Sequence, residues 1–180
     1  IFSHQVTSLS KTLDQKKLNQ VRVNDILEIN FESRKFIDKI SSFIKENNGG
    51  AIFFDYGYTS SHGDTFQAIR KNKFVSPLAD PGNADLTAHV DFNDIAKQAI
   101  NNLVNVWGPN TQRTFLKKMG AIERFKALES VSNNKIKQEL RLGLNRLIDI
   151  DEMGKLFKVL AITSNKFPSP EGFTCGTRSS

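Results

Sequence analysis

A chain of 180 residues with 38% hydrophobic and 24% charged residues has the composition of a globular protein with a single core. No apolar run approaches the roughly 20 residues of a membrane-spanning helix, so we expect no membrane span. The net charge of +6 comes from Lys and Arg residues that are scattered along the chain without interleaved aromatic residues, which favours solvated surfaces over a nucleic-acid partner.

The first third of the chain predicts a hairpin, a helix and a strand in that order. Residues 21–29, VRVNDILEI, place two β-rich runs around an Asn-Asp turn pair and predict a hairpin. An apolar stripe at helical spacing then predicts a helix that is capped by Ser33 and ends at a Gly-Gly pair. The run AIFFDYG, which follows directly, is typical of a buried parallel strand, with Asp55 toward its carboxyl end. Ligands collect at such strand ends in doubly wound α/β sheets.

The middle third predicts a short helix followed by a half-buried strand. The stretch GDTFQAIRKN offers Asp64 or Thr65 as the N-cap of a short helix, whereas SPLADPG is irregular because of its prolines. In NADLTAHVDF, apolar residues alternate with polar ones over eight positions, which predicts one strand with an apolar and a polar face. The polar face carries Asp85, Thr87, His89 and Asp91. Asp91 also directly precedes a helical stretch and is well placed as its N-cap.

The last third alternates strands and helices. LVNVW predicts a strand that ends at a Gly-Pro pair, and an apolar stripe from Gln112 predicts a helix with Gly120 as a weak point. A second stripe over residues 136–147 predicts another helix, and LFKVLAIT predicts a last buried strand. The end of the chain, PSPEGFTCGTRSS, has the composition of an exposed tail. The order of these elements indicates an α/β fold.

Cofactor and metal motifs are weak in this sequence. No two glycines stand at positions i and i+2, so no cofactor-binding glycine turn is recognisable. The pairs His62–Asp64 and His89–Asp91 have the spacing of metal ligands, but such pairs arise easily by chance, so a metal-dependent hydrolase is the least favoured hypothesis and we assign no metal ligand. The single cysteine, Cys175, excludes an internal disulfide and, with the lack of a secretory pattern, favours a cytoplasmic protein.

Four stretches of the chain resemble the MidA family of methyltransferases. They are AIFFDYGY, GDTFQAIRKNKFVSPLADPGNADLTAHVDF, GPNTQRTFLKKMGAIERFKAL and DEMGKLFKVLAITS, and the resemblance covers residues 21–173. The family is related to a mitochondrial complex I assembly factor that is an S-adenosylmethionine-dependent protein arginine methyltransferase. The resemblance therefore implies a class I methyltransferase fold with S-adenosylmethionine as its cofactor.

The resemblance extends only to the middle and C-terminal half of the family's fold. In the family, the first half supplies the glycine-rich cofactor loop, which agrees with the missing glycine turn of this chain. We expect residues 1–173 to form the C-terminal portion of a methyltransferase domain, a partial Rossmann-like α/β sheet with helices that lacks the cofactor-loop half. Residues 174–180 are expected to form an exposed tail.

The resemblance also implies a substrate-side site near the strand that carries Asp55. We expect its carboxylates to orient an incoming guanidinium, His89 to accept a proton and Tyr56 to pack against the cation. The alternative is structural, with the carboxylates capping helices and His89 holding a loop. The expected catalytic residues are Asp55, Asp64, Asp85, His89 and Asp91. The expected substrate-side residues are Tyr56, with Thr65, Gln67 and Arg70 ordering a helix that covers the site.

The leading hypothesis is that the chain is the C-terminal part of a protein arginine methyltransferase and is inactive alone. The alternative is a non-enzymatic interaction module or relic fragment that pairs with a separately encoded N-terminal half. The expected partners are that half and a protein substrate such as a respiratory complex I subunit. The expected location is the bacterial cytoplasm or, in a eukaryote, the mitochondrial matrix.

Overall fold

The computed structural model describes residues 22, 25–59, 63–80, 82–173 and 176–177, and its centre is a five-stranded mixed sheet in the order β5-β1-β7-β6-β8. The strands are β1 (Gly50–Tyr58), β5 (Val90–Asp91), β6 (Asn105–Thr111), β7 (Phe157–Thr163) and β8 (Gly176–Thr177). β7 lies antiparallel between β1 and β6, and β5 pairs in parallel with the end of β1. The α/β fold expected from the sequence is confirmed.

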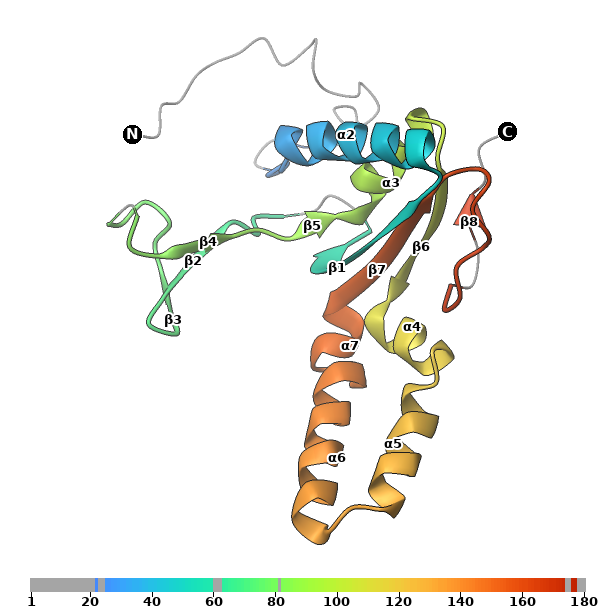
Figure 1. Ribbon diagram of the computed structural model, residues 1–180. Helices are drawn as coiled ribbons and strands as arrows, with labels where there is room; N and C mark the ends of the chain where they lie inside the picture. The colour runs from blue at the N-terminus through green and yellow to red at the C-terminus, as the bar shows by residue number, and fades with distance from the viewer. Residues whose placement is uncertain (1–21, 23–24, 60–62, 81, 174–175, 178–180) are drawn as a thin grey trace.

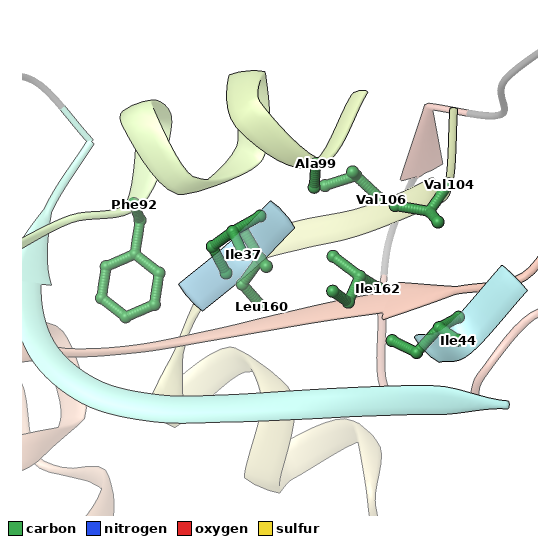
Figure 2. Close-up of a cluster of buried hydrophobic side chains, with 8 residues drawn as sticks. All are labelled: Ile37, Ile44, Phe92, Ala99, Val104, Val106, Leu160 and Ile162. Carbon is green, nitrogen blue, oxygen red and sulfur yellow. The ribbon is translucent and has the colours of Figure 1, made fainter. Parts of the chain in front are cut away.

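Two helices cover one face of this sheet and close its core. They are α2 (Phe31–Asn47) and α3 (Phe92–Asn101), and Figure 1 shows both on the same side of β1 and β7. The core between these layers consists of Ile37, Ile44, Phe92, Ala99, Val104, Val106, Leu160 and Ile162 (Figure 2). Burial of each large apolar side chain contributes about 1.5–3 kcal/mol, so this cluster holds the helices on the sheet.

The predicted strand AIFFDYG exists, but it differs from a buried parallel strand in two ways. It pairs antiparallel with β7 from Gly50 to Tyr56 and in parallel with β5 only at its last two residues. Alternate side chains also point away from the core, so that Ile52 is 48% and Phe54 is 47% exposed. The apolar run therefore supplies two different faces of a strand, and only one of them is covered by α2 and α3.

The start of the described chain differs from the predicted hairpin. Residues 25–30 contain no strand, and positions 21, 23 and 24 of the predicted hairpin lie outside the described residues. The predicted helix is confirmed, but its N-cap is Asn30, whose side chain accepts from Ser33 N–H at 3.0 Å. Ser33 therefore lies within the first turn, because an amide oxygen three residues earlier already satisfies its N–H group.

The segment after β1 forms a second, smaller sheet in place of the predicted helix. Its strands, in the order β3-β2-β4, are β2 (Gln67–Arg70), β3 (Lys73–Val75) and β4 (Asp85–Thr87). Lys71 and Asn72 both have positive φ, 50° and 59°, which is the backbone of a tight hairpin turn. The alternating stretch is accordingly two strands in different sheets, β4 and β5, because Ala88 and His89 leave the ladder between them.

The C-terminal helices form an arm that projects from the sheet. They are α4 (Gln112–Lys118), α5 (Ala121–Ser130), α6 (Asn134–Ile148) and α7 (Met153–Leu156), and Figure 1 shows α5 and α6 side by side at its far end. The predicted weak point at Gly120 is a full break, because this residue has a φ of 82° and separates α4 from α5. In the part of the chain that the structure describes, no helix is long and apolar enough to cross a membrane.

The residues expected to begin an exposed tail contact the body of the protein. Gly172 is buried, and the ring of Phe173 lies 5.2 Å from the ring of Phe115 in α4. β6 also continues past the predicted stop at the Gly-Pro pair, with a register shift against β7 after Trp107. The apolar aromatic contact keeps this segment on the sheet, where composition alone predicted solvent exposure.

The close approach of β1 and β5 depends on Gly57. A Cβ atom there would lie 2.2 Å from the carbonyl oxygen of Val90, so Gly57→Ala forces the two strands apart. We expect this substitution to lower the free energy of unfolding by about 1 to 3 kcal/mol in urea titrations. Gly143→Ala is the matched control, because no atom lies within 4 Å of its new Cβ in α6 and alanine favours the helix by about 0.5–1 kcal/mol. Equal stability of the two variants would contradict this role of Gly57.

Candidate functional site

A cavity of about 720 Å³ opens where β1 and β5 meet the N-terminal ends of α2 and α3. Its charged lining consists of Glu28, Glu32, Arg34, Asp91 and Asp94. Its aromatic lining consists of Phe31, Tyr58, Phe66 and His89. Four carboxylates against one guanidinium make this cavity acidic within a chain of net charge +6, so it favours a cationic ligand.

The pairing of β1 with β5 builds the centre of the cavity. Gly57 pairs with Val90 and Tyr58 pairs with Asp91, so the end of β1 lies beside the start of α3. Asp91 is the N-cap of α3, and its carboxylate accepts from Asp94 N–H at 3.0 Å. The predicted capping role of Asp91 is therefore confirmed, and the same side chain also lines the cavity.

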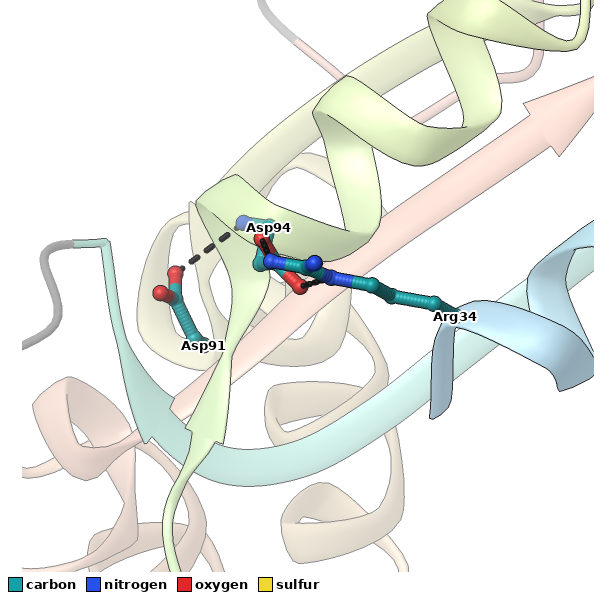
Figure 3. A network of polar contacts seen from close by, with 3 residues as sticks. All are labelled: Arg34, Asp91 and Asp94. Atoms are coloured by element: carbon teal, nitrogen blue, oxygen red, sulfur yellow. Dashed lines mark hydrogen bonds and ion pairs between the residues drawn. The ribbon is translucent and has the colours of Figure 1, made fainter. Parts of the chain in front are cut away.

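A bidentate ion pair between Arg34 of α2 and Asp94 of α3 joins these two helices at the cavity wall. Nε and one terminal nitrogen of Arg34 each donate to a different carboxylate oxygen of Asp94 at 2.7 Å (Figure 3). Both side chains are largely buried, with 24% and 17% of their surface exposed. The Arg34 guanidinium also lies 5.8 Å from the centre of the Phe31 ring. The cavity thus contains one guanidinium held by a carboxylate and an aromatic face, the usual partners of this group.

Glu28 connects Thr65, which precedes the small sheet, to Tyr58 at the end of β1 through hydrogen bonds. Its carboxylate accepts from Thr65 N–H at 2.9 Å, from the Thr65 hydroxyl, and from the Tyr58 hydroxyl at 3.1 Å. Partial burial raises the pKa of the Glu28 carboxyl, but these hydrogen bonds together outweigh burial and hold its pKa below the ordinary 4.5. The pKa of Tyr58 is raised, first by burial and further by the charges of Glu28 and Asp91.

His89 lies between two tyrosine rings. Its ring centre is 5.5 Å from those of Tyr56 and Tyr58, and its backbone N–H donates to the Thr65 hydroxyl at 3.0 Å. The same hydroxyl donates to Glu28, so Thr65 links the glutamate to the histidine. This chain of contacts fixes the imidazole at the edge of the cavity.

The structure brings some of the expected site residues together and separates others. Tyr56, Thr65, His89 and Asp91 lie in or beside the cavity. The Asp55 carboxylate accepts from the N–H of its neighbour Tyr56 at 2.8 Å. Asp64, Gln67, Arg70 and Asp85 lie outside the cavity lining. No covering helix exists at residues 64–70, because Gln67 and Arg70 belong to β2, where Arg70 forms an exposed ion pair with Asp80 at 2.6 Å.

Sequence reasoning missed Glu28, Arg34, Tyr58 and Asp94. The partners of Glu28 are 30 and 37 residues away, and Arg34 is 60 residues from Asp94. Only Asp94 carried a local signal, since an acidic residue in the first turn of a helix complements its positive end. The other three are identified only when the strands are in place.

A metal ion and a nucleotide-like cofactor place different demands on the described residues. These residues contain no group of three His, Cys, Asp or Glu side chains that could hold a metal ion, and His62 lies outside them. A nucleotide-like cofactor is commonly approached by backbone N–H groups at a glycine turn, and no two glycines of this sequence stand at positions i and i+2. Gly57 instead permits strand contact with Val90.

The lowered pKa of Glu28 predicts a pH-dependent contribution to stability. Because the folded-state pKa lies below the unfolded value, the contribution is present above about pH 4.5 and is lost as the pH falls through the folded-state pKa. Glu28→Gln should destabilise the protein by about 1 kcal/mol at pH 7, a low value because the group is only partly buried. The difference from the wild type should shrink toward pH 3 in urea unfolding.

Thr65→Val is the matched variant for this test. It removes the hydroxyl and keeps the backbone N–H that Glu28 also accepts, so we expect a smaller loss with the same pH trend. A Glu28→Gln effect that is constant from pH 7 to pH 3 would contradict the assignment.

The chain is similar in sequence to known methyltransferases. Residues 3–110 match a family described as S-adenosyl-L-methionine-dependent methyltransferases. The protein arginine methyltransferase NDUFAF7, mitochondrial, of Danio rerio is 35% identical over 90% of this chain, and that of Homo sapiens is 32% identical over 87%. The chain spans 37% and 36% of these two relatives, little more than a third of their length.

Two solved structures of COG1565 superfamily proteins from Burkholderia thailandensis share the fold. One is aligned with a TM-score of 0.72 at 25% identity, over 81% of this chain and 40% of its own. The other, bound to S-adenosyl-homocysteine, has a TM-score of 0.70 at 25% identity over 81% and 39%. The family match covers more than half of the residues, so this chain belongs to the MidA-like family of S-adenosylmethionine-dependent methyltransferases.

Proposed function

We propose that this chain forms the substrate-side part of a protein arginine methyltransferase. The observation that carries the proposal is the acidic, aromatic cavity at the junction of β1 and β5. The names of the related NDUFAF7 proteins support arginine as the acceptor. In this proposal, S-adenosylmethionine, which supplies a methyl group on sulfur, is held largely by the part of the fold that this chain does not match, since the chain covers 39% of a related structure bound to S-adenosyl-homocysteine.

The chemistry of the cavity suits a guanidinium. Its planar donors match a carboxylate in a bidentate arrangement, and its flat face stacks on aromatic rings. Arg34 shows both contacts within the cavity, with Asp94 and with Phe31. We assign Asp91 to orient the substrate guanidinium, and Tyr58 and Phe66 to limit its access to water.

His89 is the proposed proton acceptor. A guanidinium nitrogen must lose a proton when it gains a methyl group, and an imidazole is the side chain best suited to accept one near neutral pH. The rings of Tyr56 and Tyr58 hold His89 in place, and Thr65 fixes its backbone. In this proposal, Asp55 and Thr65 support the site, and Asp64 and Asp85, which are outside the lining, are assigned no contact with the guanidinium.

The proposed substrate is an arginine-bearing protein, and the resemblance to the complex I assembly factor favours a respiratory complex I subunit. The mitochondrial names of the relatives favour the mitochondrial matrix over the bacterial cytoplasm. Both assignments rest on the relatives and not on the cavity.

A second candidate function, pairing with the cofactor-binding half of the fold, is favoured by the open edge of β1. Over Gly50–Tyr56, no described strand pairs with β1 on the side opposite β7. Ile52 and Phe54 expose about half of their surface on the face away from α2 and α3. An apolar edge strand of this length binds another strand or self-associates. We propose that this edge receives the cofactor-binding half, whether that half belongs to the same polypeptide or to another.

Binding of N-acetyl-arginine methylamide to the purified chain tests the first proposal. We expect it to bind more tightly than the neutral citrulline analogue, and Asp91→Asn should weaken binding about tenfold or more because a hydrogen bond to a charged group is worth about 1.5–3 kcal/mol. Asparagine is also a good N-cap, so the fold is retained. Asp80→Asn, in the exposed pair with Arg70, is the matched control.

Excess S-adenosylmethionine should leave the melting temperature of the same chain unchanged, since a ligand raises it only by binding the folded state. An upward shift would show that the cofactor site is complete and would contradict the division into halves. Equal affinity for the arginine and citrulline compounds would contradict the substrate-side role.

Sedimentation velocity tests the role of the β1 edge. We expect the chain to self-associate as its concentration rises, and Ile52→Lys to reduce this association because a charge on an edge strand opposes pairing. Ile136→Lys changes an isoleucine of similar exposure, 43%, on α6 and should have no effect. A wild-type chain that stays monomeric at every concentration would contradict the proposal that the edge of β1 binds another strand.

A further inference from the structure

The small sheet has a free edge beside the cavity. Its order is β3-β2-β4, so β4 pairs with β2 on one side and, among the described residues, with no strand on the other. Figure 1 shows β4 and β5 following one another along one line, with the small sheet standing clear of the helices. The outer edge of β4 is therefore accessible to an extended chain.

The path from β4 leads directly into the cavity. Ala88, His89, Val90 and Asp91, which follow β4, all contribute to the cavity lining. Phe66, which precedes β2, lines it as well and is 42% exposed. A peptide that lies along β4 therefore passes the entrance of the acidic cavity.

Exposed apolar side chains accompany this edge. Leu86, at the centre of β4, is 50% exposed. Large exposed apolar groups beside a polar cavity are a common mark of a protein-binding surface. An edge of three residues offers few backbone hydrogen bonds, so stable binding needs a side chain anchored in the cavity.

We propose that the outer edge of β4 binds an extended segment of the protein substrate as an added strand, which delivers an arginine side chain into the cavity. This inference rests on the proposed arginine specificity. The peptide backbone pairs with Asp85–Thr87, its alternate apolar side chains contact Leu86, and its guanidinium meets the carboxylates beyond His89. The protein then recognises an extended, arginine-bearing segment of its substrate and not a folded surface.

The test compares three probes on the purified chain by calorimetry. They are N-acetyl-arginine methylamide, the pentapeptide acetyl-Gly-Val-Arg-Val-Gly-amide, and the same pentapeptide with both valine nitrogens methylated. We expect the pentapeptide to bind at least about tenfold more tightly than the arginine amide and backbone methylation to abolish this gain, since it removes the strand donors.

Hydrogen exchange and two variants locate the bound strand. The pentapeptide should protect amides of β4, whereas the free edge of β3, at Lys73–Val75, serves as an internal control and should stay unprotected. Leu86→Ser should reduce pentapeptide affinity several-fold without changing the affinity for the arginine amide. Phe74→Ser, which removes a 75% exposed ring from β3, should change neither.

The outcomes separate this inference from the function on which it rests. Equal affinity for the pentapeptide and the arginine amide overturns the docking edge and leaves arginine specificity intact. Protection of β3 in place of β4, or a shift to dimers without peptide binding, also overturns the docking edge. Failure of the arginine amide itself overturns both.

Discussion

The parallel pairing of Gly57 and Tyr58 with Val90 and Asp91 is the constraint on which the cavity depends. It requires a residue without a side chain at position 57, because the backbone of Val90 occupies the space a Cβ would need. Once the two strands meet, helix geometry places Asp94 one turn after Asp91, and α2 brings Arg34 to it. The contact between β1 and β5 thus determines where groups from three separate parts of the chain converge.

Most helices and strands were predictable because their signals are local. The apolar stripes of α2 and α6 and the buried run of β7 show their period directly in the sequence. Asp91 was assigned correctly as an N-cap for the same reason. The strand at residues 50–58 was also predictable, but its antiparallel partner was not, since alternation and length do not specify which strand lies beside it.

The incorrect predictions have two physical causes. The stretch around residues 67–75 became a hairpin because Lys71 and Asn72 adopt positive φ, a conformation that composition does not reveal. The alternating row was divided at Ala88 and His89 because its two ends pair with different sheets. Glu28 stayed hidden because its hydrogen bonds span 30 residues or more. The first miss is a local turn conformation, whereas the other two are contacts between residues far apart in the sequence.

The ion pair between Arg34 and Asp94 has a consequence for competition inside the cavity. Arg34 is tethered to the wall, so its guanidinium acts on Asp94 at an effective concentration on the order of millimolar or above. A free guanidinium from solution is therefore outcompeted at that carboxylate. The cavity has one negative charge neutralised in advance, and an entering cation is directed away from Asp94 toward the remaining carboxylates. Its selectivity is thus set by position within the cavity as well as by charge.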